Sequence, residues 1–286
     1  MRTEHRGLVA ILSLVTSLVP AGCGDNAPTP GAPLTLTLGA VDTCGTWQPD
    51  HQPGVSYQTP TGIRIGLTSV ELLRSHKDPA PVALPLSAAV VEVDASTGGV
   101  AASVNTGTLP QDTFTHVRLG VAFAAYHLRA TGHASMTVPG DLEIDMALSN
   151  HEYPAGQVRS QGQYSATFTA FGQTYTTSGQ TPLNCTLSAW GGIANTTGAR
   201  FEVSVPLPGG SLVVDHARST PLEVEIAFPV RDIYSWRDLD VVGYANGVLD
   251  LAAPPATGEL PDAMVECQLL MADRCQGEGV APLHPT

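Results

Sequence analysis

Basic residues are scarce in this sequence, which has 13 Lys and Arg against 26 Asp and Glu, and Lys77 is its only lysine. The formal net charge of −13 is repelled by phosphate backbones, so nucleic acid is not an expected partner. The charge favours cations or basic partners, although solubility of the folded chain is a simpler explanation. Apolar residues make up 43% of the chain, which is typical of a globular protein.

The motifs of common enzyme classes are also missing. Gly-x-Ser-x-Gly, His-Glu-x-x-His and a phosphate-binding Gly-Lys-Ser/Thr do not occur. The carboxylate pairs Glu143/Asp145 and Glu223/Glu225 are each two residues apart in predicted strands, so the members of a pair lie on one face. Glycoside hydrolysis needs two carboxylates on opposite sides of a cleft. We therefore do not expect an enzyme, and a hydrolase with a dispersed site is kept as an alternative.

The apolar stretch near the N-terminus is too short to span a bilayer. Gly7–Val19 has 13 residues, whereas a transmembrane helix needs about 20. Arg2 and Arg6 precede this stretch, and small residues follow it. This combination predicts a secretory signal peptide over residues 1–22.

Ala21-Gly22-Cys23, with Pro20 where Leu is usual, resembles the end of the lipobox of bacterial lipoprotein precursors. The resemblance implies that Cys23 carries lipid, palmitate included, and becomes the first residue of the mature chain. Asp directly after the cysteine often keeps lipoproteins in the inner membrane, and here that position is Gly24. The resemblance therefore implies an outer-membrane lipoprotein of the cell envelope, facing the periplasm or the cell exterior, with the membrane as a partner through its lipid.

The rest of the chain is expected to form a tether, a β-rich body and a tail. Residues 23–33 carry the lipidated cysteine and a segment rich in Pro and Gly, which predicts a tether. We expect a β-rich N-terminal part over 34–135, a β-rich C-terminal part over 136–276 and a flexible tail over 277–286. The boundary between the two parts is placed where Gly and Pro within 131–140 are expected to interrupt the strands.

Besides Cys23, the chain has four cysteines, an even number that predicts two disulfides in an exported protein. They are Cys44, Cys185, Cys267 and Cys275, and three pairings are possible. We favour Cys267 with Cys275, because they close a short loop, which leaves Cys44 with Cys185. The closely spaced Cys-x-x-Cys pairs typical of zinc sites are absent.

Alternation of apolar and polar residues with a period of two dominates the chain and predicts strands buried on one face. The alternation slips between Leu67 and Val70, which predicts a β-bulge near Thr68-Ser69. Gly and Pro, 29 and 23 in number, fall between the strands. The sequence therefore predicts an all-β fold, an antiparallel β-sandwich of one large unit or of two small units stapled together. The predicted apolar faces are Leu34/Leu36/Leu38, Ile63/Ile65/Leu67, Val117/Leu119/Val121/Phe123, Leu142/Ile144/Met146/Leu148, Tyr164/Ala166/Phe168, Phe201/Val203/Val205 and Leu222/Val224/Ile226/Phe228.

A set of loose motifs runs through the middle and the end of the chain. The motifs are Thr68-Ser69-Val70-Glu71-Leu72, Leu109-Pro110, Phe114-Thr115-His116-Val117-Arg118-Leu119, Trp236-Arg237-Asp238, Gly243-Tyr244 and Gly247-Val248-Leu249-Asp250. Together they resemble uncharacterised β-rich envelope lipoproteins of bacteria with GC-rich genomes. That family has no settled activity, so the resemblance implies only the fold and the location.

A candidate calcium loop lies near the C-terminus. It offers oxygen ligands from Asp238, Asp240, Asn246 and Asp250, and calcium takes six to eight oxygens. The spacing departs from the EF-hand template, since Val242 occupies a ligand position. Solvated acids in turns are the alternative, and no other cofactor is suggested.

Three histidines, His116, His127 and His133, lie close together in the sequence and raise the question of a metal site. His116 and His127 have opposite parity along a continuous strand and would face opposite sides of the sheet. Histidines on the surface or in hydrogen bonds are therefore the default expectation.

The aromatic residues Trp47, Trp190, Trp236, Tyr153 and Tyr175 would form a binding platform for sugars or peptides if they were exposed. Aromatic side chains of β proteins belong more often to the core. Exposure decides between these two interpretations.

Taken from the sequence alone, the chain is predicted to be a lipid-anchored cell-envelope protein with a binding or structural role. An envelope protein or a glycan is the expected partner. The first alternative is a calcium- or metal-dependent binding module that uses the loop Asp238–Asp250.

Overall fold

The structure, a computed structural model, describes residues 31–41, 55–133, 136–180, 188–189, 192–195, 200–237 and 247–251. The predicted all-β fold is confirmed: apart from one 3-10 turn, η1, at Thr106–Thr108, all regular secondary structure in the described chain is strand. None of the described segments forms a helix that could cross a bilayer. The strands are β1 (Pro33–Val41), β2 (Val55–Gln58), β3 (Gly62–Leu73), β4 (Val82–Ala83), β5 (Val91–Asp94), β6 (Gly99–Asn105), β7 (Asp112–Phe114), β8 (His116–His133), β9 (Thr137–Ala147), β10 (His151–Glu152), β11 (Val158–Arg159), β12 (Gln163–Ala170), β13 (Gln173–Gln180), β14 (Ser188–Ala189), β15 (Gly192–Asn195), β16 (Glu202–Pro206), β17 (Leu212–Val214), β18 (Leu222–Pro229), β19 (Tyr234–Arg237) and β20 (Asp250–Leu251).

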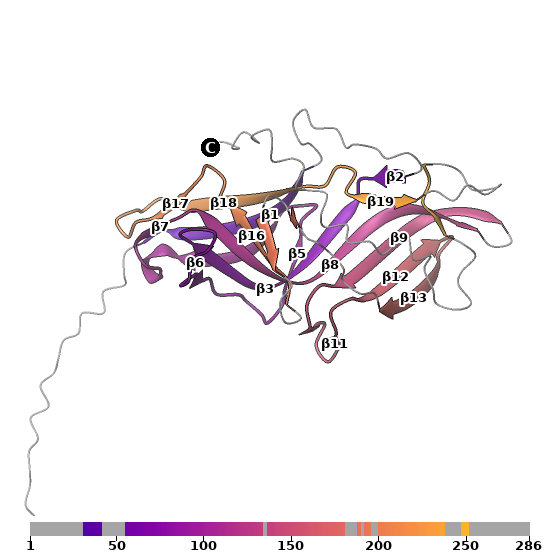
Figure 1. Ribbon diagram of the computed structural model, residues 1–286, viewed down its shortest axis with the longest axis horizontal. Helices are drawn as coiled ribbons and strands as arrows, with labels where there is room; N and C mark the ends of the chain where they lie inside the picture. Colours follow the sequence, from indigo (N-terminus) through magenta and orange to yellow (C-terminus); the bar gives the residue numbers. More distant parts are fainter. Residues whose placement is uncertain are drawn as a thin grey trace, which may run out of the picture.

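Two sheets form the body of the molecule (Figure 1). The smaller has the order β18-β1-β6, with β1 parallel to β18 and antiparallel to β6. The larger is 11-stranded and runs β13-β12-β9-β8-β16-β15-β14, with β3 and β20 also paired to β8 and with β4 and β5 paired to β3. The remaining pairs, β10–β11, β17–β7 and β19–β2, are two-stranded ribbons.

The two sheets bury a shared core, as expected for a β-sandwich. Leu34, Leu36 and Leu38 of β1 are fully buried and belong to the same cluster as Val117 and Leu119 of β8. The cluster also extends into β9, β12 and β19. Most buried apolar residues of the described chain therefore belong to one continuous core.

Strand β8 holds the large sheet together, because it exchanges one neighbour for another along its length. Its first part pairs with β16 from His116 to Gly120, and its second part pairs with β9 from Phe123 to His133. Strand β3 follows the other edge of β8 from His116 to His127. The pairing register shifts next to Thr68 in β3 and next to Ala122 in β8, so both strands bulge where the neighbour changes.

These bulges decide which side chains reach the core. The bulge expected near Thr68-Ser69 is confirmed by the register shift between Leu67 and Ser69. The prediction that Phe123 shares a face with Val121 is wrong, since Phe123 packs with Ala122 in a separate cluster on the opposite face. The second bulge inverts the alternation of β8, so that its even-numbered residues from Ala124 to Ala130 face the core.

Residues 131–133 and 137–140 do not interrupt the strands, contrary to expectation. They belong to the β8–β9 hairpin, in which Thr131 pairs with Pro139 and Ala130 pairs with Gly140. Two glycines make room here for the half-buried ring of Phe168: a Cβ at Gly132 would stand 2.9 Å from its Cε1, and a Cβ at Gly140 would stand 2.6 Å from its Cε2. The hairpin continues the chain from the predicted N-terminal part into the C-terminal part.

The other face of the large sheet carries ion pairs across its strands. Glu143 and Asp145 of β9 lie on this face, as expected, and each has an arginine partner. Asp145 lies 2.7 Å from Arg159, and Glu143 contacts Arg64, which also lies 3.0 Å from Glu92 of β5. These carboxylates join neighbouring segments, and neither lines the pocket beside the β8–β9 hairpin.

Candidate functional site

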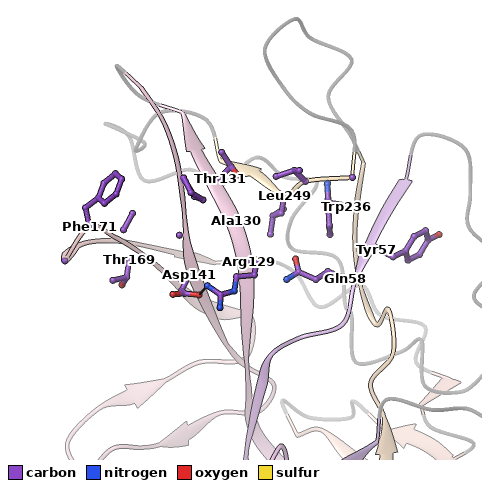
Figure 2. Close-up of a pocket in the computed structure, with 16 residues that line it drawn as sticks. Tyr57, Gln58, Arg129, Ala130, Thr131, Asp141, Thr169, Phe171, Trp236 and Leu249 are labelled. Carbon is purple, nitrogen blue, oxygen red and sulfur yellow. Dashed lines mark ion pairs between the residues drawn. The ribbon is translucent and has the colours of Figure 1, made fainter.

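An open pocket of about 630 Å³ lies at one end of the molecule. It is bounded by the β8–β9 hairpin, the turn between β12 and β13, the β2–β19 ribbon and the residues that lead into β20. In Figure 2, Phe171 lies on one side of the strand that carries Arg129, and Trp236 lies on the other side of that strand. The residues that line the pocket are Tyr57, Gln58, Arg129, Ala130, Thr131, Pro139, Gly140, Asp141, Thr169, Ala170, Phe171, Gly172, Trp236, Gly247, Val248 and Leu249.

An exposed ion pair lies in the pocket. Arg129 of β8 and Asp141 of β9 are directly paired residues, with Nη1 2.7 Å from Oδ1. Their side chains are 70% and 62% exposed, so the pair itself adds little to stability. These are the only charged side chains among the described lining residues, and the net charge of that lining is therefore zero.

The turn between β12 and β13 places an aromatic ring at the edge of the pocket. Ala170 pairs with Gln173, which leaves Phe171 and Gly172 as a two-residue turn with φ of 49° and 74°. Positive φ at both positions is the geometry of a type I′ turn, which favours Asn-Gly. Phe171 is nevertheless 83% exposed. An aromatic residue in an unfavourable backbone conformation, with most of its ring in solvent, suggests a functional role.

The wall of the pocket on the side away from Phe171 is held by hydrogen bonds to the edge of β8. In the orientation that satisfies both partners, the Gln58 amide donates to the Arg129 carbonyl (3.0 Å) and accepts from the Arg129 N–H (2.7 Å). Thr61 covers the same edge one step earlier, where its N–H donates to His127, and the carbonyl of Leu249 accepts from Thr131 one step later. Two segments that are distant in sequence, one with Gln58 and Thr61 and one with Leu249, thus cover this edge of β8.

Two tyrosines lie in the core next to this wall. Burial raises the pKa of both Tyr126 and Tyr234, so both phenols stay neutral at physiological pH. The Tyr126 hydroxyl is buried and has no hydrogen-bond partner among the described residues. Neither phenol lines the pocket.

The proposed calcium loop is only partly described. Asp238, Asp240 and Asn246 lie outside the described residues. Asp250 is described, and its Oδ1 lies 2.6 Å from Nε2 of His133. This contact ties β20 to the end of β8, where Asp250 also pairs with Thr131 in the parallel register. No cluster of three or more potential ligands from His, Cys, Asp and Glu occurs in the described part of the chain.

The three histidines do not converge. His116 and His127 both lie on the polar face, because the bulge at Ala122 inverts the alternation between them, so the expectation of opposite faces is wrong. They are 11 residues apart in one strand, which corresponds to about 35 Å. Desolvation and the neighbouring His76 lower the pKa of His116 and favour its neutral form.

Three of the five residues named for an aromatic platform are described, and these three do not form one exposed aromatic surface. Trp236 is 6% exposed and belongs to the core. Tyr153 stacks on Phe123 at 5.4 Å, and its hydroxyl donates to Glu92. Tyr175 is half exposed on β13, and Trp47 and Trp190 lie outside the described residues.

Phe171 is the exposed aromatic residue that the sequence analysis missed. A signal for it exists, because Phe-Gly separates two stretches rich in Thr and therefore occupies a hairpin turn.

The cysteines Cys23, Cys44, Cys185, Cys267 and Cys275 all lie outside the described residues. Comparison with known protein families, with curated proteins and with solved structures found no match to this chain.

Proposed function

We propose that this protein is a lipid-anchored protein of the bacterial cell envelope, held in the outer membrane through Cys23, and that it binds an envelope component in the pocket. The Ala21-Gly22-Cys23 motif and the tether that follows it support the anchor. The main support for the binding role is the position of Phe171. This residue is largely exposed, has a positive φ and lies at the edge of the pocket.

The direction of the chain supports this arrangement. Ala32, which precedes β1, exchanges hydrogen bonds with Thr106 of η1, the turn between β6 and β7. Figure 1 shows β6 and β7 at one end of the molecule and β2, β12, β13 and β19, which border the pocket, at the other. The 18 residues of β8 span about 60 Å. A tether that joins the domain at residue 33 therefore meets it at the end remote from the pocket, which is the arrangement needed to present the pocket away from a membrane.

The anchor is tested by expressing the full chain and its Cys23→Ser variant in a bacterial host. We expect the wild type in the membrane fraction, with an intact mass that corresponds to an acylated chain starting at Cys23. The variant is expected to be soluble and unacylated. An unmodified, soluble wild-type chain would refute the anchor.

The pocket is tested with the soluble Cys23→Ser protein and isolated bacterial envelopes. We expect this protein to sediment with the envelopes and the additional change Phe171→Asn to lower the bound fraction about tenfold, since removal of a central aromatic contact costs about 1–2 kcal/mol. Val158→Asn is a matched control, because Val158 is 79% exposed on β11 and does not line the pocket. Equal sedimentation of both variants would refute a binding role for this pocket.

A further inference from the structure

We infer that the pocket binds a neutral carbohydrate chain, with one sugar ring stacked on Phe171 and its hydroxyl groups bonded to Arg129 and Asp141. This inference rests on the proposed binding function and specifies its ligand. It is carried by three features of the described residues: the balanced charge of the lining, the exposed aromatic ring, and a neutral hydroxyl surface that continues from the pocket.

The charge balance argues against an ionic ligand. Arg129 and Asp141 neutralise each other at 2.7 Å. An anion that bound Arg129 would have to displace Asp141, and a cation that bound Asp141 would have to displace Arg129. A hydroxyl group both donates and accepts hydrogen bonds. One sugar hydroxyl can therefore donate to the Asp141 carboxylate while a neighbouring hydroxyl accepts from the Arg129 guanidinium, and the ion pair stays intact.

The phenyl ring of Phe171 supplies the apolar contact. It has no polar group, and its 83% exposure leaves its face open to a ligand. A pyranose ring presents a flat patch of C–H groups on one side and hydroxyls around its edge. Such a ring can stack on Phe171 through the C–H side and hydrogen-bond at its rim, which matches a pocket with one exposed ring and several polar groups.

A hydroxyl surface continues from the pocket over the β12–β13 hairpin. The hairpin from Gln163 to Gln180 contains no charged residue. Thr169 lies beside Asp141 and pairs with Thr174, and the Thr167 and Thr176 hydroxyls lie 3.2 Å apart two pairs further along the hairpin. These threonine pairs lie on the same face as the ion pair. A chain of several sugars, held in the pocket by one unit, would meet further hydroxyl groups along this surface.

The test uses isothermal titration of the soluble Cys23→Ser protein with three neutral hexasaccharides, the β-1,4-linked hexamers of glucose, mannose and N-acetylglucosamine. Hexagalacturonate and fully deacetylated chitosan hexamer serve as anionic and cationic comparators. We expect at least one neutral hexamer to bind at least tenfold more tightly than either charged one. We also expect Phe171→Asn and Asp141→Asn each to weaken that binding about tenfold, and Val158→Asn to leave it unchanged.

Preference for a charged hexamer, or no binding of any neutral one, would overturn the carbohydrate inference. Sedimentation with envelopes separates this failure from failure of the proposed function. If sedimentation still depends on Phe171 while no sugar binds, the pocket binds another class of ligand, such as a neutral peptide, and only the inference fails. If sedimentation is also insensitive to Phe171, both fail.

Discussion

The ring of Phe123 lies directly against the backbone of Gly66, its pairing partner on β3. A Cβ at residue 66 would stand 2.2 Å from Cε1 of Phe123, which no real structure tolerates without movement. The bulge at Ala122 turns Phe123 away from the main core, and Tyr153 stacks on it at 5.4 Å. Gly66 is therefore required by a close approach of an aromatic ring.

We predict that Gly66→Ala lowers the free energy of unfolding by about 1–3 kcal/mol, because the added methyl group overpacks the site. The measurement is urea-induced unfolding followed by circular dichroism. In the double variant Gly66→Ala/Phe123→Ala the clash disappears, so the two losses should add up to more than the loss of the double variant. Strictly additive losses would show that the ring and the glycine do not interact.

The amide of Gln58 takes the place of a neighbouring strand at Arg129, and we predict that it protects the Arg129 N–H. Gln58→Ala removes both the donor to the Arg129 carbonyl and the acceptor for the Arg129 N–H, so stability should fall by about 1–2 kcal/mol. Hydrogen exchange of the Arg129 amide should become at least several-fold faster. Gln173→Ala is the control, because the Gln173 side chain accepts from the exposed Tyr175 hydroxyl and does not line the pocket. Unchanged exchange at Arg129 would contradict the Gln58 contact.

Asp78 makes part of the stability dependent on pH. Its carboxylate accepts from the main-chain N–H groups of Arg74 (2.8 Å) and Ala80 (2.9 Å). These bonds, reinforced by the Arg74 guanidinium, lower the pKa of Asp78 in the folded state. A depressed carboxyl pKa adds stability that is present above the unfolded pKa and is lost as the pH falls through the folded pKa.

We therefore expect Asp78→Asn to be less stable than the wild type at pH 7, with a difference that shrinks as the pH falls towards 3. The measurement is the urea midpoint of both proteins at several pH values. A difference that stays constant over this range would show that the carboxylate charge at residue 78 has no part in stability.

Phe171 is expected to trade stability for binding. Asn adopts positive φ more readily than Phe, so Phe171→Asn should raise the free energy of unfolding by about 1 kcal/mol. Urea unfolding measures this gain, while envelope binding should fall. A variant that is both less stable and unable to bind would mean that Phe171 serves the fold, and the argument from its exposure would then be wrong.

Much of the fold was predictable, because period-two alternation records directly which residues are buried on one face. Leu34, Leu36 and Leu38 of β1 and Ile226 and Phe228 of β18 follow this rule. The bulge near Thr68 was predictable for the same reason, since apolar residues flank it with opposite parity. The orientation of Phe123 was not, because every residue from Val121 to Tyr126 is apolar and the pattern carries no parity there.

The candidate site depends on long-range pairing. Gln58, Arg129, Asp141, Phe171 and Leu249 come together only because β8 takes new neighbours after Ala122 and because its free edge is then covered by distant segments. No local pattern encodes these contacts. The exposure of Phe171 is likewise a property of the folded chain, since the same aromatic residue type forms core elsewhere.

The sequence by itself determined the all-β class, the faces of most strands and the expectation of an exported, lipidated chain, because these depend on local hydrophobic periodicity and on short motifs. Tertiary structure alone decided where β8 inverts its faces, which aromatic ring remains in solvent and which polar groups surround the pocket. These depend on strand pairing between residues far apart in the chain, and the free energy of that pairing is shared over the whole sheet.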